Sequence, residues 1–309
     1  MSIICSMSME MKEPHGRETC IAYFGDQFVM KRPLPGRDKD AWLQKQHKTK
    51  DIIDEIRAVN NPVYNIPQMV YIKDDEYQLL EERAMGEPLN LDFYQSLSPR
   101  QRTEIINGIA SFLVDMNELK PVHEEVYHNI STELKMEKFG NIIESKMPRW
   151  FKTDEIKYMT GLKNEISGFE YVTREAWSHG DLNPGNILYD KNTSKLSFID
   201  FAEADYNFIY RDIFSPLNVD LRICRPVYDL YTRLHNKDKY KVPGLRNPEL
   251  QRIMQYRMMT VLLKRFIKAG DDLRLNTQSE KTQQNNAEKV IFMRGLINAL
   301  LYTEKQMTK

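Results

Sequence analysis

The chain has few cysteines and none of the short signatures that mark the common metal and nucleotide sites. Its three cysteines, Cys5, Cys20 and Cys224, have no metal-ligand spacing, so we expect reduced thiols in a cytoplasmic protein. There is no Walker A sequence, no Gly-x-Gly-x-x-Gly, no Cys-x-x-Cys and no His-Glu-x-x-His. The absent signatures argue against the P-loop, dinucleotide, thiol-redox and zinc-protease sites that they identify.

Long apolar runs are absent as well. Nothing approaches 18 consecutive apolar residues, so we expect no membrane-spanning helix. The first residues have neither the basic segment nor the apolar stretch of a signal peptide, and none is expected. No internal repeat or low-complexity segment is present. With 309 residues, 41% hydrophobic and 28% charged, the chain has the composition of a soluble globular protein with one large domain or two lobes.

The net charge is zero, but the charge is unevenly distributed. Residues 1–205 hold 25 Lys and Arg against 34 Asp and Glu, a net charge of −9. Residues 206–309 hold 19 against 10, a net charge of +9. Solvated helix faces of opposite sign explain this split as well as a functional surface does. We expect no nucleic-acid partner and no membrane partner.

The most informative segment runs from His179 to Leu188, with the sequence His-Gly-Asp-Leu-Asn-Pro-Gly-Asn-Ile-Leu, and is followed by Phe198-Ile199-Asp200-Phe201. Phosphoryl transfer from ATP needs an Asp beside the substrate hydroxyl, an Asn five residues later that can hold Mg²⁺, and a second Asp that holds Mg²⁺ against the phosphates. Asp181, Asn186 and Asp200 supply these three groups in that order.

The residues between these groups predict a β-hairpin. Asn186 to Tyr189 and Leu196 to Ile199 have the pattern of short strands, and the five residues between them are turn formers. Such a hairpin would bring Asn186 and Asp200 to neighbouring strand ends, where one cation could contact both. The alternative is that Asp181 and Asn183 only cap a turn, but this explains neither His179-Gly180 nor the position of Asp200.

His179 invites assignment as a general base. We interpret it instead as a buried structural histidine that holds the loop backbone.

With these motifs the chain resembles the aminoglycoside phosphotransferase and choline kinase superfamily, the small-molecule branch of the protein-kinase-like fold. Protein kinases carry Arg at the position of Gly180 and Gly at the position of Ala202. The resemblance implies an α+β fold with two lobes. Residues 1–85 would form a small nucleotide-binding lobe with a β-sheet and one helix, and residues 86–309 a larger, mostly helical lobe for catalysis and acceptor binding.

The resemblance also implies roles for single residues. Asp181 would be the catalytic base, and Asn186 and Asp200 the metal ligands. Asp212 matches a structural Asp of the superfamily. Tyr206-Asn207 is similar to the corresponding residues of choline and ethanolamine kinases.

Three strands are expected at the N-terminal end. Met7 to Met11 alternates in hydropathy, and Thr19 to Phe24 pairs with Gln27 to Arg32 through a turn at Gly25-Asp26. In the resembled superfamily the first loop covers the ATP phosphates, which implies Gly16 and its neighbouring amides here. A strand lysine grips the phosphates, which implies Lys31.

A helix is predicted from Asp40 to Asn60 by apolar residues at helical spacing. The resemblance implies that an acidic residue of this helix pairs with the strand lysine. We choose Glu55, while Asp51 and Asp54 satisfy the spacing equally well.

Two more strands, Ile66 to Ile72 and Tyr77 to Glu82, precede a stretch that resembles the linker between lobes. There the backbone groups of Glu82 and Ala84 would bind adenine.

The remainder of the chain is predicted to be mainly helical. Ser98-Pro99 is a helix start, and the apolar residues from Ile105 to Leu119 form its buried stripe. Residues 131–173 are interpreted as a polar helical stretch. Further helices are expected near residues 211–235, 248–269 and 284–305.

These observations predict an ATP- and Mg²⁺-dependent phosphotransferase that phosphorylates a hydroxyl of a small molecule. A net charge of +9 on residues 206–309 argues against polycationic aminoglycosides as acceptors. A choline-like cation would need an aromatic cage, for which the chain offers Tyr206, Tyr228, Tyr231 and Tyr256. Sugars, amino acids and other neutral or anionic alcohols stay open.

Two other classes are considered. A protein kinase is disfavoured by the lack of Ala-Pro-Glu and of a long activation segment. A non-catalytic nucleotide-binding module is disfavoured because Asp181, Asn186 and Asp200 are all present.

Overall fold

The computed structural model describes most of the N-terminal half of the chain and part of the rest. The described residues are 9–11, 19–119, 125–129, 140–141, 144–145, 150–167, 170–208 and 212, with positions 227, 230, 233, 252, 263, 266–268, 270–271, 287 and 294. They belong to two compact units. Unit one comprises Met1–Pro121, Ala176–Asp212 and Arg225–Asn236, and unit two comprises Val122–Glu175, Ile213–Cys224 and Lys237–Lys309. The lobe boundary near residue 85 stays a prediction.

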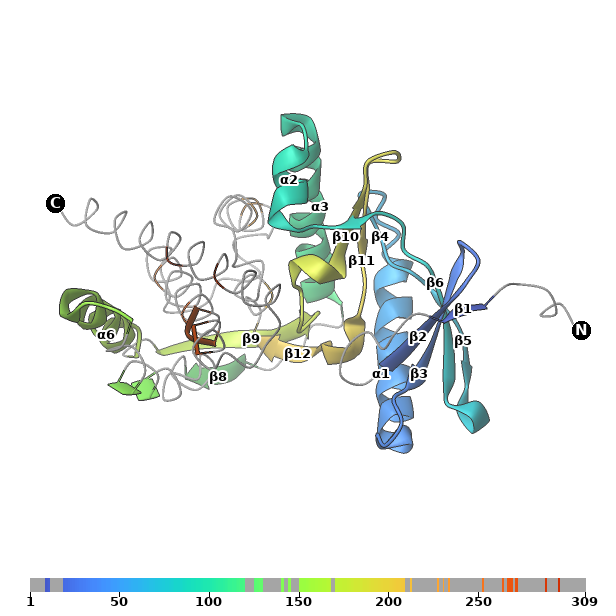
Figure 1. The fold of residues 1–309 in the computed structure, drawn as a ribbon, viewed down its shortest axis with the longest axis horizontal. Helices are drawn as coiled ribbons and strands as arrows, with labels where there is room; N and C mark the ends of the chain where they lie inside the picture. The colour runs from blue at the N-terminus through green and yellow to red at the C-terminus, as the bar shows by residue number, and fades with distance from the viewer. Residues whose placement is uncertain are drawn as a thin grey trace, which may run out of the picture. The chain divides into compact units, whose positions relative to one another are not determined.

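A five-stranded antiparallel sheet opens unit one (Figure 1). Strands β2 and β3 pair from Thr19 opposite Pro33 to Phe24 opposite Phe28, with Gly25 in the turn at a positive φ. The hairpin predicted at this position is therefore confirmed. The strand order is β1-β2-β3-β6-β5, with bounds β1 Met9–Met11, β2 Thr19–Phe24, β3 Phe28–Pro33, β5 Met69–Lys73 and β6 Gln78–Glu82.

Helix α1 (Lys39–Ala58) confirms the predicted helix and lies alongside this sheet (Figure 1). It begins at Asp38, whose side chain accepts a hydrogen bond from the Ala41 amide at 3.0 Å and so satisfies one of the free donors of the first turn. The residues that it buries recur at helical spacing: Trp42, Gln46, Thr49, Ile52, Ile53 and Ile56. The 3-10 turn η1 (Asp74–Glu76) joins β5 to β6.

A second sheet holds the predicted hairpin. Strand β10 (Ile187–Asp190) pairs antiparallel with β11 (Lys195–Phe198), from Ile187 opposite Phe198 to Asp190 opposite Lys195. The two short strands β4 (Tyr64–Asn65) and β7 (Glu87–Pro88) complete the order β4-β11-β10-β7. The hairpin and its turn are as predicted, because the turn formers and the apolar strands are local signals.

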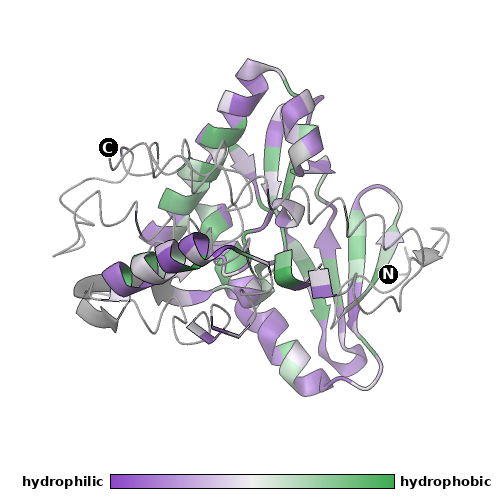
Figure 2. Cartoon of the chain, turned by 60° about the vertical axis from the view of Figure 1, so that its left-hand side comes forward, coloured by the Kyte–Doolittle hydropathy of each residue, from purple (hydrophilic) through white to green (hydrophobic). Residues whose placement is uncertain are grey.

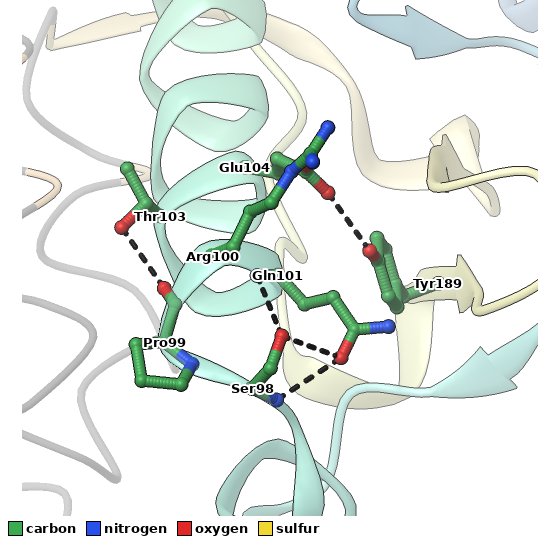
Figure 3. Close-up of polar contacts among 7 residues, drawn as sticks. All are labelled: Ser98, Pro99, Arg100, Gln101, Thr103, Glu104 and Tyr189. Carbon is green, nitrogen blue, oxygen red and sulfur yellow. Dashed lines mark hydrogen bonds and ion pairs between the residues drawn. The ribbon is translucent and has the colours of Figure 1, made fainter.

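Helices α2 (Leu91–Ser96) and α3 (Pro99–Glu118) follow strand β7 along the chain. Ser98 and Gln101 form a capping box at the start of α3, with the Ser98 hydroxyl 3.3 Å from the Gln101 amide, as Figure 3 shows. The buried stripe of α3 packs on the hairpin through Phe112, whose ring stacks on Phe198 at 3.9 Å between centroids. The Tyr189 hydroxyl donates a hydrogen bond to Glu104 of α3 at 3.1 Å (Figure 3).

Unit two contains strand β8 (Glu125–Asn129), helix α6 (Thr153–Ser167) and strand β9 (Glu170–Ser178), whose last three residues belong to unit one. The prediction of a helical stretch over residues 131–173 is wrong at its end. Residues 170–173 form a strand, because their aromatic and β-branched side chains favour that conformation and β8 pairs with them. The helices predicted near 211–235, 248–269 and 284–305 lie almost wholly outside the described residues.

The described elements are those of an α+β protein. Hydrophobic and hydrophilic residues lie side by side along the strands and helices (Figure 2), which is the pattern of elements with one buried face. None of the described helices is long and apolar enough to span a membrane.

Candidate active site

The loop after β9 is held at its start by one buried carboxylate. Asp212, only 3% exposed, accepts hydrogen bonds from the amides of His179 at 2.5 Å and Gly180 at 2.9 Å. A buried carboxylate needs such partners, and backbone amides are rigid ones. The structural role predicted for Asp212 is therefore confirmed.

Gly180 has a positive φ of 82° and no room for a side chain. A Cβ atom on Gly180 would lie 2.0 Å from the Glu203 carbonyl oxygen and 2.7 Å from its carbonyl carbon. Both atoms belong to the backbone, so they cannot move away as a side chain would. The loop thus passes directly against the segment after Asp200, which requires glycine at this position.

His179 is fully buried, and both its ring nitrogens have partners. Its Nδ1 accepts a hydrogen bond from the Asp181 amide at 3.4 Å, so the proton is assigned to Nε2, which donates to the Ile199 carbonyl at 2.9 Å. His179 thereby joins the backbone of Asp181 to the residue before Asp200. The prediction of a structural histidine is confirmed.

Asp181 lies half-buried in this loop and is held from two sides. Its Oδ2 atom accepts hydrogen bonds from Nδ2 of Asn183 at 3.1 Å and of Asn186 at 3.4 Å. Its carbonyl oxygen accepts a closer bond from Asn186 Nδ2, at 2.8 Å. The carboxylate is therefore oriented through one of its two oxygens.

Asn186 and Asp200 come together at the open end of the hairpin, as predicted. The Ile199 amide donates to the Asn186 carbonyl at 3.0 Å, which extends the β10–β11 pairing to the residue before Asp200. Asp200 has a left-handed backbone with φ 64°, a conformation that costs roughly 1–3 kcal/mol and that clusters at functional sites. Because Asn186 uses its Nδ2 on Asp181, its Oδ1 is the atom left for a cation.

The donor atoms fit Mg²⁺ bound together with a nucleotide. Asn186 offers an amide oxygen and Asp200 an exposed carboxylate, both of which are hard ligands. Among the described residues no group of three or more His, Cys, Asp and Glu could hold a metal ion. Mg²⁺ is commonly bound by one or two protein groups and substrate phosphates. The site therefore suits that cation better than one that needs an all-protein cage.

Lys31 forms an ion pair with Glu81 of β6, at 2.8 Å between Nζ and Oε2. The two side chains are 19% and 8% exposed. Burial acts to lower the pKa of Lys31, but the carboxylate of Glu81 and then that of Asp200 outweigh it, so the pKa is raised above its usual value. The predicted partner Glu55 is thus corrected to Glu81, because sheet pairing brings β6 beside β3.

Most of the predicted site residues line one cavity of about 800 Å³. All residues that line this cavity belong to unit one. Of the eight predicted site residues, six line it: Lys31, Glu82, Ala84, Asp181, Asn186 and Asp200. Glu55 does not line this cavity, and Gly16 lies outside the described residues.

Glu82, Arg83 and Ala84 line the cavity, but part of their backbone already forms hydrogen bonds. The Glu82 amide donates to the Gln68 carbonyl at 2.9 Å, and the Arg83 amide donates to the Gln27 carbonyl at 2.7 Å. A contact between Glu82 and a base would therefore use its carbonyl oxygen. The predicted role of Glu82 and Ala84 in adenine binding stays a prediction.

Glu81 is the site residue that the sequence reasoning missed. The strand predicted from Tyr77 to Glu82 alternates, and the structure buries Leu79 and Glu81 on one face. An acidic residue at an inward-facing position is unusual in a strand, because a buried carboxylate needs a partner. The inward-facing position of Glu81 in the predicted strand was therefore the feature of the sequence that could have identified it as a site residue.

Comparison with known proteins agrees with this arrangement. A model of the phosphotransferase enzyme family matches residues 21–234 of the chain. The probable ethanolamine kinase B of Dictyostelium discoideum is 31% identical over 99 residues, which are 30% of this chain and 22% of that protein. The matched stretch is thus less than a quarter of the relative's length.

Solved structures share the fold at low sequence identity. The GDP and kanamycin complex of APH(2")-IIia superposes with a TM-score of 0.60 and 16% identity, covering 94% of this chain and 95% of that one. A choline/ethanolamine kinase family protein from Mesorhizobium loti has a TM-score of 0.55 and 10% identity, covering 96% and 91%. The predicted protein-kinase-like α+β fold is therefore confirmed.

Proposed function

The chain belongs to the phosphotransferase enzyme family, and from this premise we propose that it transfers a phosphoryl group from Mg²⁺-bound ATP to a hydroxyl of a small molecule. One observation carries the proposal. Lys31, Asp181, Asn186 and Asp200 come from three separate segments, since Asp181 and Asn186 share one loop, and all four line a single cavity. A turn-capping role for Asp181 would not require the other three residues to share that cavity.

Each of these residues has a distinct task in the proposed reaction. Asn186 and Asp200 would hold Mg²⁺, which when bound neutralises charge on the nucleotide phosphates. Lys31 binds the same phosphates through its ammonium group. Asp181 orients the acceptor hydroxyl and accepts its proton as the oxygen becomes bonded to the γ-phosphorus, while the bond from that phosphorus to the bridging oxygen breaks and ADP leaves.

The fixed backbone of the loop supports this division of tasks. Asp212 holds its first two amides, and His179 joins Asp181 to the strand end that carries Asp200. The base and one metal ligand therefore keep their spacing before any substrate binds. Such preorganisation is a large part of what proteins contribute to phosphoryl transfer, in which positioning and electrostatic stabilisation dominate.

The acceptor is proposed to be a small alcohol rather than a protein. The family relationship supports this class, and the similarity to an ethanolamine kinase makes amino alcohols the first acceptors to assay. The net charge of +9 on residues 206–309 still argues against kanamycin-like polycations.

The proposal is tested by measuring ATP consumption with a panel of amino alcohols, sugars, aminoglycosides and proteins. Asp181→Asn provides the blank, since it keeps the shape of the side chain but removes the base. We expect turnover of the active acceptor to fall by about 10²–10⁴. Affinity for ATP with Mg²⁺ should stay close to that of the wild type, because the metal contacts are assigned to other residues.

Asp92→Asn, the same change at an exposed position in α2, is the matched control and should leave turnover unchanged. Turnover of Asp181→Asn within a few-fold of the wild type would refute the catalytic assignment. Loss of folding or of ATP binding in Asp181→Asn would make Asp181 structural. ATP binding without turnover of any acceptor would favour a non-catalytic nucleotide-binding module, and turnover with proteins alone would favour a protein kinase.

A further inference from the structure

The acidic partner of Lys31 is a residue of strand β6, whereas the resemblance implied a residue of helix α1. The side chains that α1 contributes to the cavity are Lys45, Gln46, Thr49 and Ile53, and none of them is a carboxylate. Of the other acidic residues considered, Asp54 is exposed and pairs with Lys50 in the preceding turn. Helix α1 therefore does not supply the carboxylate that meets the strand lysine.

The register of the sheet determines the contact between Lys31 and Glu81. Val29 lies opposite Glu81, and Lys31 lies opposite Leu79, so Lys31 and Glu81 are diagonal neighbours on the same face of β3 and β6. A shift of one residue in this pairing would move every side chain of a strand to the other face. The pair is thus built into a rigid sheet and does not depend on how a helix docks.

We infer that Glu81 is a positioning residue of the nucleotide site, which holds the Lys31 ammonium in the cavity where the phosphates of a nucleotide bind. The inference rests on the proposed function and adds a residue to it. Lysine has a long, flexible side chain that loses rotamer freedom when it is held in one place. Glu81 fixes that geometry before the nucleotide arrives.

The charges around Lys31 agree with this role. The groups that act on it are Glu81 from β6, Asp200 after β11 and Tyr23 from β2. Because the ammonium is largely buried, removal of Glu81 leaves Asp200 as the carboxylate that acts on it, and that residue is assigned to the metal. Without Glu81, Lys31 is expected to leave its place in the cavity or to turn toward Asp200.

The first experiment measures the affinity for a non-hydrolysable ATP analogue with Mg²⁺ by titration calorimetry. Glu81→Gln should weaken binding by about ten-fold, the size of one charge-assisted contact. Glu81→Asp keeps the carboxylate and should lose no more than about three-fold of the affinity, since a shorter carboxylate still pairs with the ammonium. In a Lys31→Met background, Glu81→Gln should have no further effect, because Glu81 acts through Lys31.

The second experiment needs no nucleotide. Brief labelling with a small amine reagent, followed by peptide mass spectrometry, compares the reactivity of Lys31 in the apo proteins. Lys31 should label several-fold faster in Glu81→Gln than in the wild type, whereas Asp54→Asn, which removes an exposed carboxylate from α1, should not change it. Thermal unfolding identifies variants that do not fold. If Glu81→Gln does not fold, the test uses Glu81→Asp and the double variant of Lys31→Met with Glu81→Gln.

The outcomes distinguish a failure of the positioning role of Glu81 from a failure of the proposed function. If the wild type binds the analogue but Glu81→Gln binds it equally well or more tightly, the positioning role is overturned and the proposed function stands. The role is also overturned if Glu81→Gln weakens binding equally with and without Lys31. If the wild type binds no nucleotide while Lys31 labelling still responds to Glu81→Gln, the proposed function fails and the ion pair is structural only.

Discussion

Replacement of Gly180 by alanine tests how closely the loop that holds Asp181 packs on the segment after Asp200. The new Cβ atom would lie 2.0 Å from the Glu203 carbonyl oxygen, and φ is 82°, where a side chain is strained. The left-handed backbone costs alanine roughly 1–2 kcal/mol. Overpacking against backbone adds about 1–3 kcal/mol. Alanine also makes the unfolded chain less flexible, which offsets about 0.4–1 kcal/mol of the loss, so we expect a net loss of about 1–5 kcal/mol.

Gly25→Ala separates the two contributions. Gly25 also has a positive φ, 56°, but a Cβ atom there would meet nothing within 4 Å. Gly25→Ala should therefore lose no more than about 1.6 kcal/mol, because only backbone strain applies. Urea denaturation followed by tryptophan fluorescence measures both variants. The reasoning is refuted if Gly180→Ala is no less stable than Gly25→Ala, because the loop would then have room beside Glu203.

The other predictions concern the metal, the loop and the acceptor. ATP should bind more tightly with Mg²⁺ in the wild type but not in Asp200→Ala, and equal Mg²⁺ dependence in calorimetry would contradict the metal assignment. Asp212→Ala should lower the free energy of unfolding by about 2–5 kcal/mol, because two amides lose their acceptor, and Asp212→Asn should recover part of this loss. Urea denaturation measures both variants, and an unchanged midpoint in Asp212→Ala would contradict the prediction. Expression should not protect a sensitive bacterium from kanamycin; resistance with the wild type but not with Asp181→Asn would show that local acidic groups outweigh the regional charge.

Many secondary-structure elements could be predicted, because their signals are local. Ser98-Pro99 begins α3 through a capping box that involves only residues of its first turn. The turn formers between Tyr189 and Leu196 specify the hairpin in the same way. The strand at residues 170–173 was missed because a pattern of four residues is too short to tell a strand from a helix, and pairing with β8 decides its conformation.

For the candidate site, the residue types and their spacing along the chain determined which chemistry to expect. Asp181, Asn186 and Asp200 stand within 20 residues of each other, and the hairpin between them is itself readable from the sequence. Contacts between distant segments required the tertiary structure. Lys31 and Glu81 are 50 residues apart and meet only because β3 lies next to β6. Helical spacing identified acidic residues of α1 as candidates, but spacing carries no information about which strand lies beside another.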